Sequence, residues 1–475
     1  MKLHNTLTKQ TTKFAPLDGK TARIYSCGPT VYNHAHIGNL SAYIYADILR
    51  RAVRLAGYQT KHVMNFTDVD DKTIRDSKAD YPELEPMTAL QQLTAKYEAI
   101  FLDEMQQVGN DTDAITFVKA TDNIAKIQAQ VTKLVDSGVA YLADDGIYFS
   151  IAKYAADHCY GQLSHINPAD ISRERVANDE YDKASISDFA IWKKQKPGEP
   201  AWDFTVNGQD YTGRPGWHIE CSVMSTDNLG QPFDIHTGGV DLIFPHHENE
   251  IAQSTAGDQP AEYAKYFVHN EHLLIDGRKM SKSAHNFYTL PDLIKRGFSG
   301  LDFRMLVLQS NYSSATNFSW DGLTAARNRR DNWRRCAELR WQLPDTADRS
   351  AVSASVDHLL AQAKTALLNN LDTPATLYAL DQAMNLLTPA HFSSTALLYV
   401  LEFIDCYLGM ELQATTPDLE DDLKDLIATR QTARQTKNWA LSDQLRDQLS
   451  AQGITVLDGA GASVWHRTET SSGQQ

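Results

Sequence analysis

KTARIYSCGPT (residues 20–30) has the composition of a short strand that ends in a Gly-Pro turn. LSAYIYADILRRAVRLAGY (residues 40–58) shows the periodicity of an amphipathic helix, which Gly57 closes. A second strand, QTKHVMNFTDVDDK (residues 59–72), then runs into an acidic loop. Strand, turn, helix and strand in this order form the start of a doubly wound parallel sheet. The sequence therefore predicts an α/β fold.

Polar residues follow both strands at the points where the strands are expected to end. In doubly wound sheets, ligands bind beyond the carboxyl ends of the strands. Cys27, the turn after it and the stretch Asn65–Asp71 all fall at this edge. We therefore expect the ligand site there, although we interpret Asp68, Asp70 and Asp71 as a solvated acidic turn without a catalytic role.

The bulk composition is that of a folded, water-soluble protein. The chain has 475 residues, of which 42% are hydrophobic and 22% are charged, and this length suggests about three domains. The N-terminal stretch MKLHNTLTKQTTKFAP has no apolar centre, and no run of eighteen apolar residues occurs anywhere. Neither a secretory signal nor a transmembrane helix is therefore expected.

Cysteine usage and net charge limit the compartment and the partners. The five cysteines are an odd, sparse set, which argues against a disulfide framework and for a reducing compartment. We therefore expect a cytoplasmic protein. The net charge of −15 means that an RNA partner must meet a local basic patch. RNRRDNWRR (residues 327–335) is the strongest basic run, although most charge runs are simply solvated helix faces.

The rest of the chain divides by pattern. Residues 85–137 are predicted to be mainly helical, and residues 138–200 are mixed and polar, which indicates an insertion rather than a part of the sheet. FDIHTGGVDLIFPHHENEIAQS (residues 233–254) returns to a strand, a Gly-Gly loop and a helix. Helical patterns continue from about residue 300, followed by a linker at 411–419 and two final helices over 419–436 and 439–451.

FPHHENE (residues 244–250) concentrates potential metal ligands behind a proline. Pro245 suits the first turn of a helix. If a helix begins there, His246 and Glu250 are four residues apart and share a face, which is a metal-ligand spacing. A solvated helix shows the same spacing by chance, so this stretch alone leaves both interpretations open.

Two further segments favour phosphate binding. HAHIGN (residues 34–39) follows the first strand at the start of a helix, where free N–H groups and a positive potential suit phosphate. Gly38 allows close approach to the backbone, and His36 can donate to phosphate oxygens. KMSKS (residues 279–283) is a cationic segment whose lysines act as point charges. A turn with incidental histidines and a solvated loop are the alternatives for each segment alone.

The pair resembles the "HIGH" and "KMSKS" signatures of class I aminoacyl-tRNA synthetases, with Asn39 in place of the last histidine. The resemblance is most specific to the cysteinyl-tRNA synthetase family. CGPTVYNHAHIGN, NFTDVDDK, GRPGWHIECS, FPHHENEIAQS, KMSKS and a C-terminal NWALSDQLRDQLSAQGITVLDG occur here in that family's order and cover nearly the whole chain. Two stretches depart from the family pattern: SAHN follows the lysines, and TGGV (residues 237–240) replaces a triple glycine.

The resemblance implies a division of the chain into functional segments. It implies a Rossmann-like catalytic domain in two halves, an inserted connective domain, a helical stem-contact and bundle region, an anticodon-binding domain and a disordered tail. These segments would span residues 1–115 and 201–300 for the two halves, 116–200 for the insertion, 301–410 for the bundle, 411–467 for the anticodon-binding domain and 468–475 for the tail.

The resemblance also implies one zinc ion at the floor of the amino-acid pocket. The matching ligands are Cys27, Cys221, His246 and Glu250, which are residue types that zinc favours. We expect two of them at strand ends and two on one helix face. His247 is the competing ligand, and Glu248 is expected in an outer layer or on the helix surface. Zinc would recognise the substrate thiol, because shape alone separates close isosteres by only about 1–3 kcal/mol.

The implied reaction joins cysteine to tRNA(Cys) by way of cysteinyl-adenylate, with Mg²⁺ accompanying ATP. By resemblance, His36, Gly38 and Asn39 contact the triphosphate, and Lys279 and Lys282 stabilise the leaving pyrophosphate. The same resemblance assigns Gly238, Gly239 and Asp241 to the adenosine, and Thr67, Trp217 and His236 to the cysteine pocket. Plain core packing is the alternative for Trp217.

The C-terminal unit is expected to read the anticodon. By resemblance, Trp439 stacks on a base, while Arg434, Asp443 and Asp458 pair with base edges. Helix-surface charge is the alternative for each of these residues. The expected partners are thus ATP, L-cysteine and tRNA(Cys), with no membrane, and the expected state is a monomer.

Three other functions are alternatives to this interpretation. A ligase that joins cysteine to an amino sugar shares the catalytic core but does not need the C-terminal segment. A non-catalytic RNA-binding or cysteine-sensing protein is favoured only by HIGN and TGGV. A zinc hydrolase is suggested by histidine–glutamate spacing, but HHENE is not the H-E-x-x-H arrangement.

Overall fold

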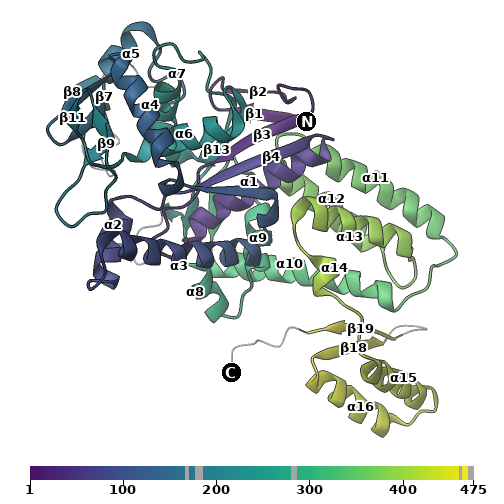
Figure 1. Ribbon diagram of the computed structural model, residues 1–475. Helices are drawn as coiled ribbons and strands as arrows, with labels where there is room; N and C mark the ends of the chain where they lie inside the picture. Colours follow the sequence, from purple (N-terminus) through teal and green to yellow (C-terminus); the bar gives the residue numbers. More distant parts are fainter. Residues whose placement is uncertain (166–170, 177–185, 280–285, 459–462, 469–475) are drawn as a thin grey trace. The chain divides into compact units, whose positions relative to one another are not determined.

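The computed structural model describes residues 1–165, 171–176, 186–279, 286–458 and 463–468 (Figure 1). The chain forms two compact units. The first comprises Met1–Leu274, Arg278–Thr289 and Tyr312–Thr316, and the second comprises Ile275–Gly277, Leu290–Asn311 and Asn317–Gln475.

Five parallel strands form the central sheet of the first unit, in the order β14 (Ala264–Asn270), β13 (Phe233–Gly239), β3 (Thr21–Ser26), β4 (Gln59–Phe66) and β5 (Ile115–Lys119). The chain adds β4 and β5 on one side of β3, and later β13 and β14 on the other. The strand order therefore reverses between β3 and β13, which is the topological switch point where such sheets bind ligands. The predicted doubly wound α/β fold is confirmed.

Helices cover both faces of this sheet, because its strands bury apolar side chains on both sides. Helix α1 (Ile37–Leu55) connects β3 to β4, and Figure 1 shows it on the face opposite α6 (Trp217–Leu229). Tyr25 and Val63 share an apolar cluster with Met224 of α6 and Ile251 of α7 (Glu248–Thr255). The helix predicted over residues 40–58 thus begins and ends three residues earlier than expected.

Residues 85–137 are mainly helical, as predicted, but they also contain a strand that was not expected. Helices α2 (Asp71–Asp80) and α3 (Pro86–Gln107) are present, but β5 follows them and forms an edge of the central sheet. Its five residues lie close to α4 (Ile124–Asp136), and such a short strand leaves little periodic signal between two amphipathic helices. Partnership with β4 along its whole length decides its conformation.

A second sheet occupies the polar middle stretch. It has the order β12 (Gly213–Pro215), β9 (Ile186–Lys194), β7 (Gly146–Phe149) and β6 (Ala140–Ala143), with β8 (Ile171–Val176) also paired to β9. Among the described strands, none of these pairs with the central sheet. Phe149, Phe189 and Trp192 form its core together with α4, α5 (Ile151–Asp157) and Phe204. The prediction that this stretch is not part of the central sheet is confirmed.

Three hairpins complete the first part of the chain. They are β1 (Lys2–Asn5) with β2 (Gln10–Lys13), β10 (Thr205–Val206) with β11 (Gln209–Asp210), and β15 (Leu273–Ile275) with β16 (Arg278–Lys279). The predicted turn at Asp276 and Gly277 joins the last pair. Both residues have positive φ angles, of 48° and 75°, as two-residue hairpin turns require.

The second unit is helical, as predicted. Its helices are α8 (Leu290–Lys295), α9 (Gly300–Leu308), α10 (Trp320–Glu338), α11 (Arg349–Leu367), α12 (Thr373–Leu386), α13 (Ser394–Leu408) and α14 (Leu412–Thr415), and the short strand β17 (Thr316–Phe318) lies between α9 and α10. The stretch predicted as a linker at residues 411–419 contains α14, and it buries Leu412 and Thr416 completely. The linker prediction is therefore wrong for its first half.

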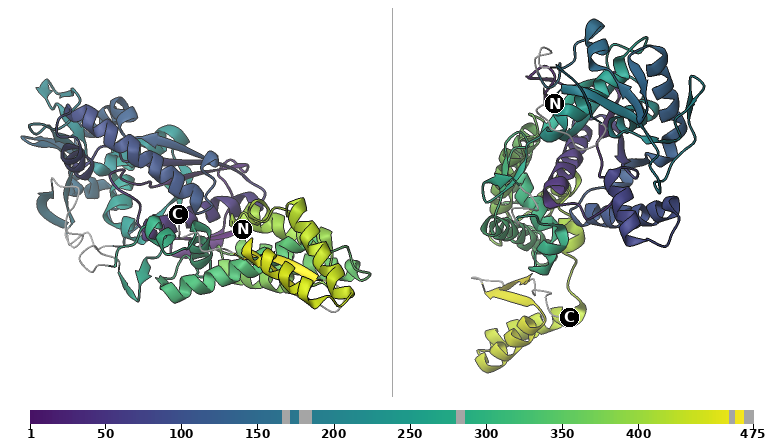
Figure 2. Two further views of the ribbon diagram at one scale, coloured as in Figure 1. Left: turned by 90° about the horizontal axis from the view of Figure 1, so that it is seen from below. Right: turned by 90° about the vertical axis from the view of Figure 1, so that its left-hand side faces the viewer.

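The C-terminal part of this unit has its own small core. Helices α15 (Asp421–Gln435) and α16 (Trp439–Ala451) lie side by side (Figure 2), and β18 (Ile454–Asp458) pairs with β19 (Ser463–Arg467). Leu449, Ile454 and Trp465 are buried between them. Both final helices thus agree closely with their predicted ranges. None of the helices in the described ranges is long and apolar enough to cross a membrane.

Candidate active site

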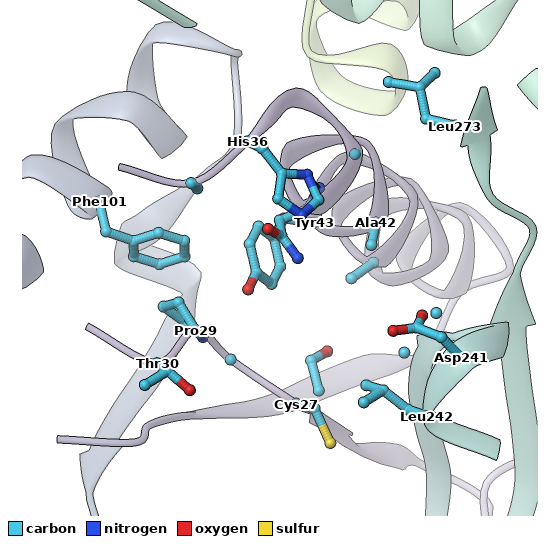
Figure 3. A pocket seen from close by; sticks show the side chains of 18 of the residues that line it. Cys27, Pro29, Thr30, His36, Ala42, Tyr43, Phe101, Asp241, Leu242 and Leu273 are labelled. Carbon is cyan, nitrogen blue, oxygen red and sulfur yellow. Dashed lines mark hydrogen bonds between the residues drawn. The ribbon is translucent and has the colours of Figure 1, made fainter. Parts of the chain in front are cut away.

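A cavity of about 500 Å³ opens at the carboxyl ends of β3 and β13, which is the switch point of the sheet. All of its lining residues belong to the first unit. Figure 3 shows Cys27 at its floor, with Asp241 and Leu242 on one side and Phe101 on the other. Cys27 follows β3 directly, so the sequence-based expectation that the ligand site lies at this edge agrees with the structure.

The start of α1 forms one wall of this cavity. His36 is the N-cap of α1, and its Nδ1 accepts a hydrogen bond of 3.2 Å from the backbone N–H of Asn39. In a neutral imidazole, an accepting Nδ1 places the hydrogen on Nε2. His36 therefore offers a donor at its other nitrogen. His36, Gly38 and Asn39 all line the cavity, as the helix-start motif predicts.

The segment that follows the KMSKS motif returns to the same helix start. The backbone N–H of Ile37 donates to the carbonyl oxygen of Tyr288 at 2.9 Å, and the ring of Phe287 lies 5.2 Å from that of His36. The residues that follow the second motif thus lie beside the start of the helix that carries the first. Lys282 and the side chain of Lys279 lie outside the described residues.

A buried cluster of metal-ligating residues lies beneath the cavity. The ligating atoms of Cys27, Cys221, His246 and Glu250 are all within 4.8 Å of one another. Ligands bound at about 2.0–2.3 Å around a tetrahedral zinc ion lie within about 4 Å of one another, so the cluster suits such an ion. His246 and Glu250 lie on one side of the helical segment, as their spacing predicts, because His246 Nε2 lies 3.0 Å from Glu250 Oε1.

The position of Cys221 differs from the expectation that two ligands follow strands. Cys27 does follow β3, but Cys221 is the fifth residue of α6. GRPGWHIECS contains a strand, β12, but Gly216 ends it and caps α6. The packing of α6 on the central sheet brings the Cys221 thiol over Cys27. This placement depends on long-range packing and has no local sequence signal.

The ionisable groups of the cluster shift one another's pKa values. A hydrogen bond from Cys27 lowers the pKa of Cys221 to about 6, while burial raises the pKa of Cys27 well above its usual value. Burial opposes the protonation of His246, but Glu250 and Cys221 outweigh it and raise the pKa of His246 to about 10. A carboxylate and a thiolate thus face one shared positive charge, and a divalent cation would supply that charge in place of the proton.

A second set of potential ligands overlaps the first. Cys27 and Glu250 also lie within 4.8 Å of the ligating atoms of His236 and His247. His236 Nε2 is 2.7 Å from Glu250 Oε2, and His247 Nε2 is 3.2 Å from Cys27 Sγ. His236 is completely buried and does not line the cavity, so any effect on the substrate passes through its neighbours, among them Cys27 and Glu250.

Further buried groups hold the ligands in place. His218 Nδ1 lies 2.8 Å from His246 Nδ1, the hydroxyl of Tyr263 donates to Glu250 at 2.8 Å, and His269 Nε2 lies 2.8 Å from His247 Nδ1. These three residues were not identified from the sequence. Such outer contacts fix ring orientation and ligand basicity.

Two predictions about outer residues are resolved by the structure. Glu248 is not on the helix surface: it is 1% exposed and accepts hydrogen bonds from Gly161, Leu163 and Ser164. Trp217 lines the cavity and stacks on His246 at 4.3 Å, so it is not plain core packing.

The chain belongs to a known family by direct comparison. Residues 13–328 match the model of the class I (C) tRNA synthetase catalytic domain, and residues 416–465 match that of the cysteinyl-tRNA ligase anticodon binding domain. A cysteine–tRNA ligase of Solibacter usitatus is 38% identical over 98% of this chain and 99% of its own length. A cysteine–tRNA ligase of Chlamydia felis is 37% identical over 96% of this chain and 95% of its own length. The chain is a member of the cysteine–tRNA ligase family.

A solved structure shows the same fold at low identity. Methionyl-tRNA synthetase of Mycobacterium tuberculosis, in complex with methionyl-adenylate, aligns with a TM-score of 0.59 and 14% identity. The alignment covers 83% of this chain and 93% of that one. At this identity the likeness concerns the fold alone, which is that of a class I synthetase.

Of the other residues expected in the cavity of a cysteine–tRNA ligase, some line it and Thr67 does not. Gly239 and Asp241 line the cavity, and a Cβ on Gly239 would lie 2.5 Å from the Asp241 carboxylate. Only glycine therefore fits beside Asp241 in this conformation. Thr67 is buried beneath the turn after β3, where its backbone pairs with Pro29 and Val31, and it does not line the cavity. Thr30, which the sequence did not single out, does.

Two carboxylates of the acidic turn predicted to be solvated are buried in this member of the family, whereas the Asp71 side chain is 40% exposed. Asp68 is 3% exposed and accepts hydrogen bonds from Thr121, and burial raises its pKa to about 6. Asp70 is 6% exposed and caps α2 through the N–H of Thr73. Tertiary contacts bury both carboxylates. The acidic sequence alone does not reveal these contacts.

The residues expected to face the anticodon differ in their surroundings. Trp439 is 56% exposed, with the guanidinium of Arg434 at 5.9 Å from its ring. Asp443 is also exposed and pairs with Arg446. Asp458, in contrast, accepts two hydrogen bonds of 2.8 Å from Arg430 and pairs with Arg434.

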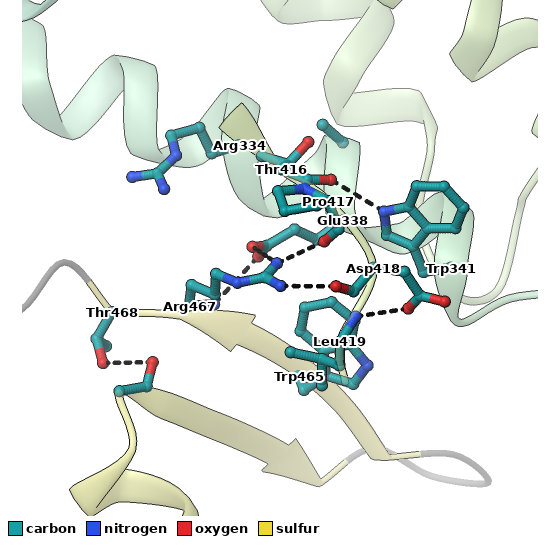
Figure 4. A network of polar contacts seen from close by, with 12 residues as sticks. Arg334, Glu338, Trp341, Thr416, Pro417, Asp418, Leu419, Trp465, Arg467 and Thr468 are labelled. Atoms are coloured by element: carbon teal, nitrogen blue, oxygen red, sulfur yellow. Dashed lines mark hydrogen bonds and ion pairs between the residues drawn. The ribbon is translucent and has the colours of Figure 1, made fainter. Parts of the chain in front are cut away.

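The end of α10 holds the C-terminal hairpin in place (Figure 4). Arg467 of β19 donates to the Glu338 carboxylate at 3.2 Å and to the carbonyl oxygen of Pro417 at 2.7 Å. Gln342 bonds both backbone groups of Trp465, at 2.6 and 2.9 Å. These side-chain contacts add to the pairing of β19 with β18.

The basic run on α10 is largely engaged within the second unit. Arg330 and Arg327 lie 3.0 and 3.7 Å from the Asp302 carboxylate, and Arg329 pairs with Asp381. Their charges are therefore compensated, which weakens the prediction that this run contacts tRNA.

Proposed function

We propose that this chain is a cysteine–tRNA ligase. It activates cysteine with ATP to cysteinyl-adenylate and transfers the cysteinyl group to the 3′ end of tRNA(Cys). The observation that carries this proposal is the buried Cys27–Cys221–His246–Glu250 cluster at the cavity floor, in a chain whose relatives are named cysteine–tRNA ligases. The match of residues 416–465 to an anticodon-binding domain favours tRNA over an amino sugar as the acceptor.

A zinc ion held by these four residues would supply a soft Lewis acid for the substrate thiolate and so favour cysteine over serine. The chain's own residues shape that site. Trp217 stacks on His246 and closes one side of the pocket, and His218 orients His246 through its other nitrogen. Cys27 is 9% exposed and Glu250 is completely buried, which excludes most water from the thiol subsite.

The first step forms a mixed anhydride. A carboxylate oxygen of cysteine attacks the α-phosphorus of ATP, the bond from that phosphorus to the bridging oxygen breaks, and pyrophosphate leaves with the electron pair. His36 supports this step, because its Nδ1 is engaged with Asn39 and its Nε2–H can donate to a phosphate oxygen. Lys279 and Lys282 keep the role that the motif predicts, which is to stabilise charge on the leaving group together with Mg²⁺.

The adenosine would lie beside the carboxyl end of β13. Gly239 permits backbone approach, and the exposed carboxylate of Asp241 can accept hydrogen bonds from ribose hydroxyls. In the second step, a ribose hydroxyl oxygen of the tRNA attacks the cysteinyl carbonyl carbon. The bond from that carbon to the phosphate oxygen breaks, AMP leaves with the electron pair, and the hydroxyl proton is released.

The domain functions and the oligomeric state belong to the same proposal. The segments keep the roles predicted for them, from the two catalytic halves to the anticodon-binding part. The oligomeric state in this proposal is the monomer expected from the sequence.

The test is ATP–pyrophosphate exchange by the purified protein, measured with each amino acid in turn and with the zinc content assayed in parallel. Exchange with cysteine alone, lost on chelation and restored by zinc, is the expected result. Charging of tRNA(Cys) but not of an amino sugar then separates the two ligases. A folded, zinc-loaded protein without exchange would overturn the proposal and favour a non-catalytic role for HIGN and TGGV.

A further inference from the structure

One end of the cavity is not used by the residues that bind cysteine, ribose or phosphate in the proposed reaction. This end, here called the aromatic end, is lined by Tyr32, His34, Lys72, Tyr97 and Phe101. Figure 3 shows Phe101 across the cavity from Asp241 and Leu242. The thiol subsite occupies the floor, the ribose subsite lies beside Asp241, and the phosphate subsite lies at His36. The aromatic end is therefore the part of the same cavity that remains for the acceptor of the second step.

A buried carboxylate fixes the histidine of this end. His34 Nδ1 lies 2.6 Å from Glu104 Oε1, and the Glu104 side chain is 4% exposed whereas that of His34 is 37% exposed. Beside an ionised carboxylate, the hydrogen of a neutral imidazole sits on Nδ1, which leaves Nε2 as an acceptor. His34 and His36 thus offer opposite hydrogen-bonding groups to one cavity, an acceptor and a donor.

The rings at this end alternate with cations. Lys96 Nζ lies 4.9 Å from the centre of the Tyr97 ring, and Lys72 Nζ lies 5.8 Å from that of Tyr32. The His34 ring meets Tyr97 edge-on at 6.3 Å. Aromatic faces combined with positive charge are the chemistry that binds single-stranded nucleic acid, in which bases stack and phosphates need compensation. A second cysteine, which has neither a ring nor a phosphate, would use neither feature.

We propose that the aromatic end receives the 3′-terminal nucleotide of tRNA, with Tyr97 packed on that nucleotide and His34 Nε2 accepting a hydrogen bond from it. This proposal rests on the proposed function, because it places the acceptor of the same reaction. Glu104 is a positioning residue, since it holds His34 and does not itself line the cavity. The spacing of 70 residues between His34 and Glu104 hides the pair from any local reading of the sequence.

The experiment separates the two half-reactions in full-length protein. His34→Ala and Tyr97→Ala are assayed for cysteine-dependent ATP–pyrophosphate exchange and, in single turnovers, for transfer from preformed cysteinyl-adenylate to tRNA(Cys). Exchange should stay within about twofold of wild type, whereas transfer should slow by about 10-fold or more, as expected for loss of one stacked base. Tyr97→Phe keeps the ring and should restore transfer. Tyr399→Ala, which removes an exposed tyrosine of α13, is the matched control and should change neither rate.

A second measurement tests binding rather than transfer. Wild type should bind tRNA(Cys) about 10-fold more tightly than the same tRNA lacking its terminal adenosine, and Tyr97→Ala should bind both equally. Unchanged transfer in both alanine variants, or equal losses of exchange and transfer, would overturn the assignment of this end to the terminal nucleotide. Absence of exchange in wild type would instead overturn the proposed function, so the two failures are distinguishable.

Discussion

His246 Nε2 and Glu250 Oε1 lie 3.0 Å apart on consecutive turns of one helical segment, with both side chains buried. Burying the Glu250 carboxylate is costly unless a positive charge compensates it. Glu250 and Cys221 raise the pKa of His246 to about 10, which favours a protonated imidazole as that charge. A divalent cation would provide it more effectively, because it would contact all four groups at once. Metal binding and the integrity of this cluster should therefore change together.

Replacing Cys221 by serine should remove the metal. Cys221→Ser exchanges a soft thiolate for a hydroxyl that zinc binds poorly. We expect zinc content to fall well below one ion per chain and discrimination between cysteine and serine in exchange to fall by at least about 10-fold. Metal analysis and exchange with both amino acids provide the measurement. Cys336→Ser is the control, because Cys336 is also buried but lies in the second unit.

The two overlapping ligand sets can be separated by neighbouring histidines. His246 belongs to the set with Cys221, and His247 to the set with His236. We expect His246→Asn to lose zinc as Cys221→Ser does, while His247→Asn retains it with weakened affinity. The two residues are adjacent and both buried, so each variant controls for the other. Loss of zinc from His247→Asn alone would move the site to the second set.

The parts of the fold that were predictable are those with a local pattern. The strand before Cys27, the helix after it and the spacing of His246 and Glu250 all follow from periodicity or from capping chemistry. The position of Cys221 in a helix and the burial of Asp68 were mispredicted, because both depend on contacts between distant segments. The short strand β5 was missed for the same reason. The cluster was identified largely through the family resemblance, since spacing accounts for only two of its four members.

The buried histidine His62 should make folding sensitive to acid. Burial, with the nearby Arg50, lowers its pKa to about 3 in the folded protein, while its Nε2 contacts Ser26 Oγ at 2.7 Å and Asp47 opposes the effect weakly. The unfolded chain therefore binds this proton more tightly. Stability is complete above the usual pKa of 6.5 and is lost as the pH falls from there toward 3.

His62→Gln removes this titration and keeps a side chain that can bond Ser26. Between pH 7 and pH 5, wild type should lose about 2 kcal/mol more stability than the variant. Urea unfolding of both proteins at the two pH values measures the difference. His358→Gln, at an exposed position of α11, should show the wild-type pH dependence. Parallel behaviour of His62→Gln and wild type would contradict the assignment.

Asp302 should be essential for the stability of the second unit. It is completely buried, it lies 3.0 Å from Arg330 Nε and 3.7 Å from Arg327 Nε, and it bonds the N-cap of α9. Asp302→Asn keeps the shape but leaves buried guanidinium charge without compensation, which typically costs about 3–5 kcal/mol. Thermal unfolding should show a clearly lower midpoint. Asp357→Asn, on an exposed part of α11, should stay within about 0.5 kcal/mol of wild type.

Trp439 and Asp458 should behave differently although both were expected to face the anticodon. Trp439 is exposed with Arg434 beside its ring, so Trp439→Ala should raise the KM for tRNA(Cys) by about 10-fold, as loss of one stacked base predicts, and leave exchange unchanged. Asp458 is held by Arg430, whose side chain is 3% exposed. Asp458→Asn should therefore lower the stability of the C-terminal hairpin as well as tRNA affinity. Charging of an acceptor-stem minihelix, which lacks an anticodon, is the control and should be insensitive to both changes. A Trp439→Ala protein that charges full-length tRNA as well as wild type does would remove this surface from recognition.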